Sequence, residues 1–220
     1  QVLNGVNQLH PDSAPGASGW TNNAIKFLAK HAGRPEEREL LGRALTAVVN
    51  RLWAGQMPLS VRGLWTRARV VFIPKSGGSW RPLGLRDAWY RLVTRIVARA
   101  EAGPLGEKIS DNQLAVGVRG GCEIGAHIAQ LHTSVTVTAD DVTDGDDFVS
   151  VGDDARNFFG ELALGDDTLE EMRVEIPHLV RGIWWFYGAP SELIGTDGTV
   201  IGHREVGTAQ GCPLSTMICS

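Results

Sequence analysis

Apolar residues recur at helical spacing through much of this chain. Between Glu36 and Trp53 they return every three or four positions, which predicts a helix with one buried face; its apolar members are Leu40, Leu41, Leu45, Val48, Val49 and Leu52. Similar patterns predict further helices over 24–31, 88–101, 122–131, 166–175 and 177–187. Residues 1–20 are instead punctuated by Pro and Gly, which predicts a loop.

Shorter apolar runs bounded by turn residues predict strands. Residues 69–73 precede Gly77-Gly78 and a second extended run, which predicts a β-hairpin. A second hairpin is predicted over 192–204, because Asp197-Gly198 is a strong turn signal. A third run, 148–152, leads directly into two aspartates. Helices and strands of this kind predict an α+β fold.

The charge of the chain is divided between its two parts. Residues 1–120 hold 17 Lys and Arg against 8 Asp and Glu, whereas residues 121–220 hold 4 against 17. The net charge of −4 hides this division. The basic part could follow nucleic-acid phosphates and the acidic part could hold divalent cations. The alternative is a solvated surface on which charge is unevenly distributed by chance.

Cysteine usage and hydropathy bear on the compartment. Cys122, Cys212 and Cys219 form no C-x-x-C pair, which indicates reduced thiols and an intracellular location. No apolar run approaches the roughly 18 residues of a membrane span, and no signal-peptide pattern opens the chain. The chain lacks an initial Met and stops just after a motif, so we expect a fragment of a longer protein.

Short motifs follow one another in a defined order. They are Pro74-Lys75-x-Gly77, Arg81-Pro82-Leu83, Asp154-x-x-Asn157-x-Phe159 and Gln210-Gly211-Cys212-Pro213-Leu214-Ser215. In this order they resemble the motifs of reverse transcriptases, most closely those of retroelements that lack long terminal repeats. Ala14-Pro15-Gly16-x-x-Gly19-Trp20 is similar to the opening segment of that subtype. The resemblance therefore covers nearly the whole chain.

The resemblance implies the fingers and part of the palm of a right-hand polymerase, with an antiparallel palm sheet. It divides the chain into four parts. Residues 1–110 would be a fingers-like region, and residues 111–162 a first palm segment with the strand of the catalytic Asp. Residues 163–206 would be a helical and hairpin return, and residues 207–220 a second palm segment. The family's Asp-Asp hairpin and thumb would lie beyond Ser220. We therefore expect residues 1–220 alone not to polymerise.

The implied activity is RNA-directed DNA polymerisation by two-metal nucleotidyl transfer. By the resemblance, Asp154 is the catalytic ligand of two Mg²⁺ or Mn²⁺ ions, and the carbonyl of Ala155 also binds metal. Lys75 and Arg81 would neutralise the triphosphate of the incoming deoxynucleotide. The same resemblance implies that Phe159, Gln210 and Gly211 also belong to the nucleotide site. Phe159 would reject a 2′-hydroxyl.

Residues that would hold an RNA template and DNA primer lie earlier in the chain. Residues 51–99 carry ten Lys and Arg and a single acid, Asp87. On the helix predicted over 88–101, basic residues four apart would share one face: Arg91, Arg95 and Arg99. Gln113 and Gly117 match a segment that lies near the template in the family. The resemblance also implies a nuclear location.

Three positions depart from the family pattern. Asp153 stands where an apolar residue is usual, Phe158 where a small one is usual, and Ser18 where an acid is usual. Either Asp153 or Asp154 could therefore be the metal ligand, and the spacing to Phe159 favours Asp154.

Two other functions stay open on the sequence. One is a non-catalytic nucleic-acid-binding relic of a retroelement polymerase. The other is an unrelated metal-dependent phosphohydrolase that uses the acidic stretch 140–147. That stretch does not fit a calcium-binding EF-hand, because Val142 and Val151 occupy ligand positions. Each motif residue taken singly also has an ordinary structural role, such as a helix cap for Asp154.

Overall fold

The structure is a computed structural model that describes residues 2–109, 113–114, 116–138, 164–208 and 212–218. Its strands are β1 (Ala68–Pro74), β2 (Trp80–Arg86), β3 (Ser191–Ile194) and β4 (Val200–Arg204). Its helices are α1 (Val2–Asn7), α2 (Asn22–His31), α3 (Pro35–Trp53), the 3₁₀ turn η1 (Leu59–Val61), α4 (Arg62–Thr66), α5 (Ala88–Ile109), α6 (Gly121–Thr138), α8 (Asp166–Glu175), α9 (Pro177–Tyr187) and α10 (Ser215–Ile218). The predicted α+β class is confirmed.

The described strands form one mixed sheet in the order β2-β1-β3-β4. Both predicted hairpins are present and antiparallel, with Pro74 opposite Trp80 in the first. The hairpins meet through β1 and β3, which run parallel, with Ala68 opposite Leu193. The prediction of an antiparallel sheet is thus wrong for these strands, because turn signals do not specify how two separate hairpins join. The strand predicted at 148–152 lies outside the described residues.

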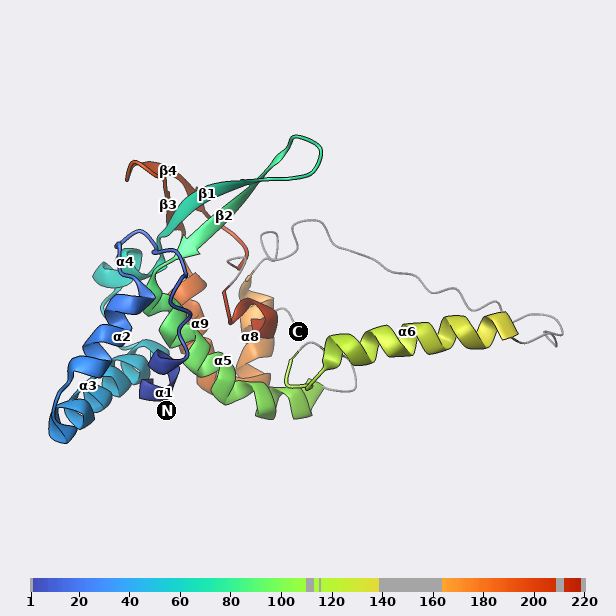
Figure 1. The fold of residues 1–220 in the computed structure, drawn as a ribbon, viewed down its shortest axis with the longest axis horizontal. Coiled ribbons are helices and arrows are strands. Elements are labelled where there is room, and N and C mark those ends of the chain that lie inside the picture. The colour runs from blue at the N-terminus through green and yellow to red at the C-terminus, as the bar shows by residue number, and fades with distance from the viewer. Residues whose placement is uncertain (1, 110–112, 115, 139–163, 209–211, 219–220) are drawn as a thin grey trace.

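Several predicted helices extend beyond the ends that we expected. The helix predicted over 88–101 continues to Ile109 although it contains Pro104. Pro104 is exposed and Leu105 is buried against the core, so packing of the last turns outweighs the local stop signal. The helix predicted over 122–131 continues to Thr138 as α6, which projects away from the rest of the chain (Figure 1). Helices α8 and α9 have the predicted limits.

The first 20 residues are not entirely the loop that we predicted. Val2–Asn7 form helix α1, in which Val2 and Val6 are buried. A Cβ atom at Gly5 would lie 2.9 Å from the side chain of Ile96, so the missing side chain lets α1 approach α5. A helix this short is stabilised by tertiary packing rather than by its own propensity, which explains why the sequence did not indicate it.

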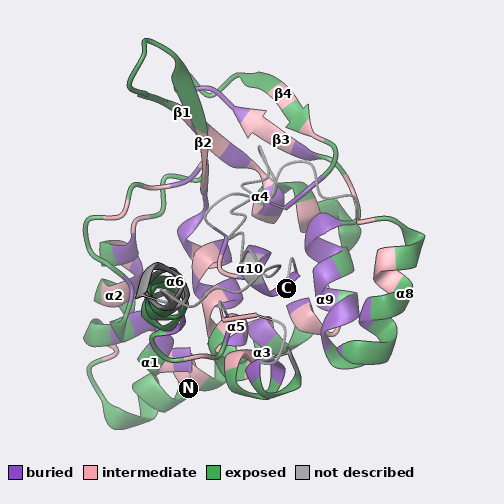
Figure 2. Cartoon of the chain, turned by 90° about the vertical axis from the view of Figure 1, so that its right-hand side faces the viewer, coloured by how far each residue is buried: buried purple, intermediate pink, exposed green. Residues whose placement is uncertain are grey.

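The main core lies between α3, α5 and α9 and is seen as buried segments in Figure 2. Leu52, Tyr90 and Ile183 are among its fully buried side chains. Leu40, which we predicted on the buried face of α3, is 61% exposed. The buried residues of α3 are Val49 and Leu52 in its C-terminal half, whereas Leu41 is only partly buried against the second core cluster.

The aromatic run in α9 is divided between core and surface. Trp185, Phe186 and Tyr187 are buried, whereas Trp184 is 44% exposed. The guanidinium of Arg62 lies 5.2 Å from the centre of the Trp184 ring and donates to the Trp184 carbonyl oxygen at 2.8 Å.

No described helix combines the length and the hydropathy that a membrane span requires.

Candidate functional site

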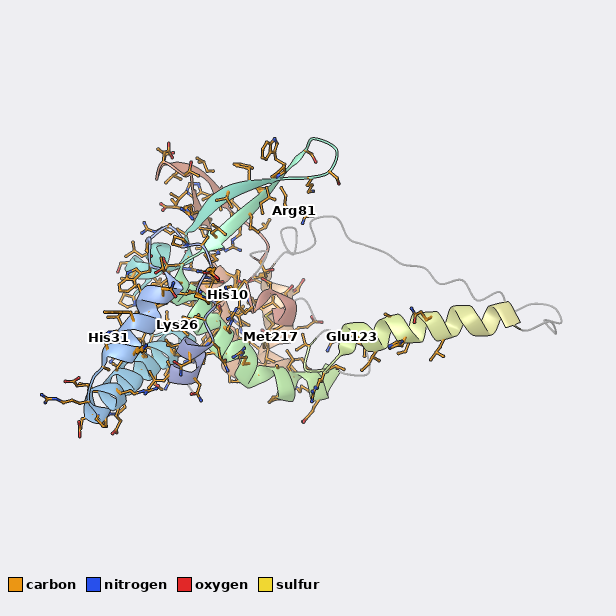
Figure 3. The ribbon with its side chains drawn as sticks, in the orientation of Figure 1. His10, Lys26, His31, Arg81, Glu123 and Met217 are labelled. Carbon is orange, nitrogen blue, oxygen red and sulfur yellow. The ribbon has the colours of Figure 1, made fainter. Side chains whose placement is uncertain are left out.

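The β1–β2 hairpin projects from the body of the molecule and carries two of the predicted site residues (Figures 1 and 3). Gly77 and Gly78 form its turn with φ values of 97° and 81°, a backbone region that suits glycine. Lys75 precedes the turn and Arg81 follows it, and both side chains are exposed. Neither the Lys75 ammonium nor the Arg81 guanidinium has a hydrogen bond or ion pair with another described residue. The hairpin therefore presents two uncompensated cations to solvent.

Large apolar side chains accompany these cations. Phe72 is 59% exposed and Trp80 is 62% exposed, and both lie in the outer half of the hairpin. Neighbouring strand residues point to opposite faces of a sheet. Phe72 and Trp80 therefore share one face of the hairpin, and the side chain of Arg81 points to the other.

The three arginines predicted to contact template and primer have different surroundings in α5. Arg91 Nη2 donates to the Ala14 carbonyl oxygen at 3.0 Å, and Arg95 Nη1 donates to the Gln8 carbonyl oxygen at 3.3 Å. Burial lowers the pKa of Arg91, with the Asp87 charge acting in the opposite direction. Arg99 is exposed. Arg91 and Arg95 thus hold the N-terminal segment on α5, which leaves Arg99 as the most accessible of the three.

Gln113 and Gly117 have clear structural roles in the turn that follows α5. The Gln113 side chain donates to the Val116 carbonyl oxygen at 3.0 Å and accepts from the Val116 N–H at 2.8 Å. Gly117 has a φ of 73°, and a Cβ atom there would overlap the backbone of Ala102 and Gly106. These contacts explain both residue types without a template.

The segment 14–20 is anchored where β2 passes into α5. A Cβ atom at Gly16 would lie 2.6 Å from the Cα of Asp87, so only glycine permits this approach. The Ser18 hydroxyl and the Ser18 N–H both donate to Asp87 Oδ2, and the rings of Trp20 and Trp89 meet edge to face at 5.5 Å. Sequence reasoning missed Asp87 as a structural residue, although its position as the only acid in 51–99 was a signal.

A buried polar triangle lies beneath the segment that follows Gln210-Gly211. The hydroxyl oxygens of Tyr90 and Tyr187 are 2.9 Å apart. Cys212 Sγ lies 3.0 Å from the Tyr90 hydroxyl oxygen and accepts a hydrogen bond from the Tyr187 hydroxyl at 2.9 Å. Burial raises the pKa of both tyrosines, so both hydroxyls stay protonated. Cys212 is a free thiol. The triangle fixes the start of the last segment against α5 and α9.

The remaining predicted residues lie outside the described part of the chain: Asp154, Ala155, Phe159, Gln210 and Gly211. Their described neighbours Thr208 and Cys212 are buried. Within the residues that the structure describes, no group of three or more His, Cys, Asp and Glu could hold a metal ion. The predicted metal ligands are not among those residues.

Comparison with known proteins adds no family to this picture. No protein-family model matches the sequence, and no curated protein matches it.

Proposed function

We propose that this chain is the fingers and part of the palm of an RNA-directed DNA polymerase of the type found in retroelements without long terminal repeats. The order of the motifs around Lys75, Asp154 and Gln210 carries the proposal. The β1–β2 hairpin supports it, because Lys75 and Arg81 are exposed beside its turn, where they could reach a triphosphate. The hydrogen bonds of Cys212 with Tyr90 and Tyr187 anchor the residue that directly follows Gln210-Gly211 in the sequence.

In this proposal the chain binds an RNA template, a DNA primer and a deoxynucleoside triphosphate. Lys75 and Arg81 hold the triphosphate, Phe159 occupies the space of a 2′-hydroxyl, and Gln210 with Gly211 lines the pocket for the incoming base. The carboxylate of Asp154 and the carbonyl of Ala155 are oxygen donors of the kind that Mg²⁺ prefers. Two bound Mg²⁺ ions would lower the charge on the attacking and leaving oxygens. A nuclear location belongs to the same proposal.

Primer extension tests the activity directly. The sample is residues 1–220 together with any coding sequence that continues beyond them, supplied with a primed RNA template, deoxynucleotides and Mg²⁺. Template-dependent extension is expected. A protein that binds the primed template but never extends it would instead be the non-catalytic relic, to which the departures at Asp153 and Phe158 point.

The hairpin cations should determine part of the salt dependence of nucleic-acid binding. Each phosphate contact contributes about 0.9 to the slope of log K against log salt on a duplex. Replacing Lys75 and Arg81 together with Gln should therefore flatten that slope by about 1.8. The measurement is fluorescence anisotropy of a labelled duplex titrated at several salt concentrations.

Arg43→Gln is the matched control, since Arg43 is an exposed cation on α3, away from the hairpin. Its slope should equal that of the parent chain. If the slope of log K against log salt is the same for the parent and for the Lys75→Gln, Arg81→Gln double variant, the hairpin is not part of the binding surface.

A further inference from the structure

One face of the sheet carries a cavity that no step of the proposed polymerase reaction uses. Its volume is about 570 Å³, within the range of small-ligand sites. Strands β1, β2 and β3 supply apolar walls that include Val70, Phe72 and Leu193, and two arginines, Arg86 and Arg204, also line it. Phe72 and its cross-strand partner Pro82 both line the cavity. Because neighbouring strand residues point to opposite faces of a sheet, the side chain of Arg81 lies on the face opposite the cavity.

Arg86 is buried without the partners that a buried guanidinium needs. It is 5% exposed, and its Nε and Nη1 atoms have no hydrogen-bond partner among the described residues. Its guanidinium lies 5.2 Å from the centre of the Tyr90 ring, and no described carboxylate forms an ion pair with it. The adjacent Asp87 is engaged by Ser18 and by the Trp89 N–H instead. A buried and unpaired charge is costly, so this position favours an anion.

Arg204 is a second, half-buried cation that lines this cavity, and its Nη1 donates to the Gly207 carbonyl oxygen. Its guanidinium lies 4.9 Å from the centre of the Tyr187 ring, and its Nε donates to Ser191 Oγ at 3.1 Å. Burial lowers the pKa of Arg204, and the positive charge of Arg86 lowers it further. Two like charges therefore line the cavity, and the exposed residue Glu205 also lines it.

We propose that this cavity is an oxyanion site that binds a phosphate group through Arg86 and Arg204. Guanidinium groups present several N–H donors to phosphate oxygens and remain charged when buried. The apolar walls and the cavity volume leave room for a nucleoside attached to that phosphate. The phosphate belongs either to a free nucleotide or to the backbone of a nucleic acid, and both use the same two cations.

Thermal unfolding of the 220-residue chain tests the site without any need for polymerisation. The probes are inorganic phosphate, a mononucleoside monophosphate and a short oligonucleotide. At about 100 times its Kd, a ligand of the native state should raise Tm by roughly 5–10 °C for a chain of this size. In Arg86→Met the affinity for the same probe should fall at least about tenfold.

The unliganded variants separate a ligand site from a purely structural arginine. Arg86→Met should unfold at a higher temperature than the parent without ligand, because it removes a buried and uncompensated charge. Arg204→Gln, which keeps the contact between Arg86 and Tyr90, should also weaken phosphate binding. Arg43→Gln should leave both the Tm and the response to phosphate unchanged.

The three probes identify the source of the phosphate. Equal affinity for the mononucleotide and the oligonucleotide indicates a free nucleotide, and a much higher affinity for the oligonucleotide indicates a backbone phosphate. The site is overturned if none of the probes shifts Tm, or if the shifts in Arg86→Met equal those of the parent. Failure of primer extension would leave these measurements valid, so the two proposals fail separately.

Discussion

Gly182→Ala should destabilise the folded chain by about 3 kcal/mol, the upper end of the usual cost of overpacking a core. Gly182 lies in α9 against the indole of Trp53, and a Cβ atom there would come closer than 3.0 Å to three atoms of that ring. The ring is rigid and is held edge to face by Phe186 at 5.6 Å, so it cannot yield as a flexible side chain would. For a chain of this length the loss corresponds to a fall in Tm of about 6–12 °C.

Gly103→Ala is the matched control for this substitution. Gly103 lies within α5, and a Cβ atom there meets nothing within 4 Å. The same change should therefore stabilise the chain by about 0.5–1 kcal/mol, because alanine loses less backbone entropy in a helix than glycine does. Thermal and urea unfolding of both variants measures the difference. A Gly182→Ala variant as stable as the parent would mean that α3 and α9 are not packed as described.

Asp154→Asn should reduce primer extension on the order of 10³-fold or more in the assay proposed above, because a metal ligand supports several kcal/mol of transition-state stabilisation. The amide is close in size to the carboxylate but carries no negative charge, so it holds divalent cations poorly. Binding of the primed template should be nearly unchanged, since the proposed phosphate contacts belong to the basic hairpin and α5. Single-nucleotide incorporation and anisotropy on the same preparation measure the two effects.

Asp153→Asn is the control that decides between the adjacent carboxylates. It should retain most of the extension activity, because the spacing to Phe159 places Asp154, rather than Asp153, in the metal-ligand position of the motif. The reverse result, with Asp153→Asn inactive and Asp154→Asn active, would move the proposed site by one residue. Normal activity in both variants would rule out this motif as the metal site.

The sequence by itself determined the elements whose signals are local. The turns at Gly77-Gly78 and Asp197-Gly198 predicted both hairpins, and Pro177 marked the start of α9. The exposed cations Lys75 and Arg81 of the candidate site followed from the first hairpin. These predictions succeeded because turn chemistry and helical periodicity act over a few neighbouring residues. The predicted functions of Asp154 and Gln210 remain predictions.

The tertiary structure decided how these elements meet. It joined the hairpins in parallel through β1 and β3, formed α1 against α5, and gave Arg91 a partner in the N-terminal segment. The contact of Tyr90 with Cys212 joins residues 122 positions apart. Arg86 and Arg204 come together at the sheet cavity only when both hairpins are in place. Local patterns specify which face of an element is apolar, but which surfaces meet depends on packing across the whole chain.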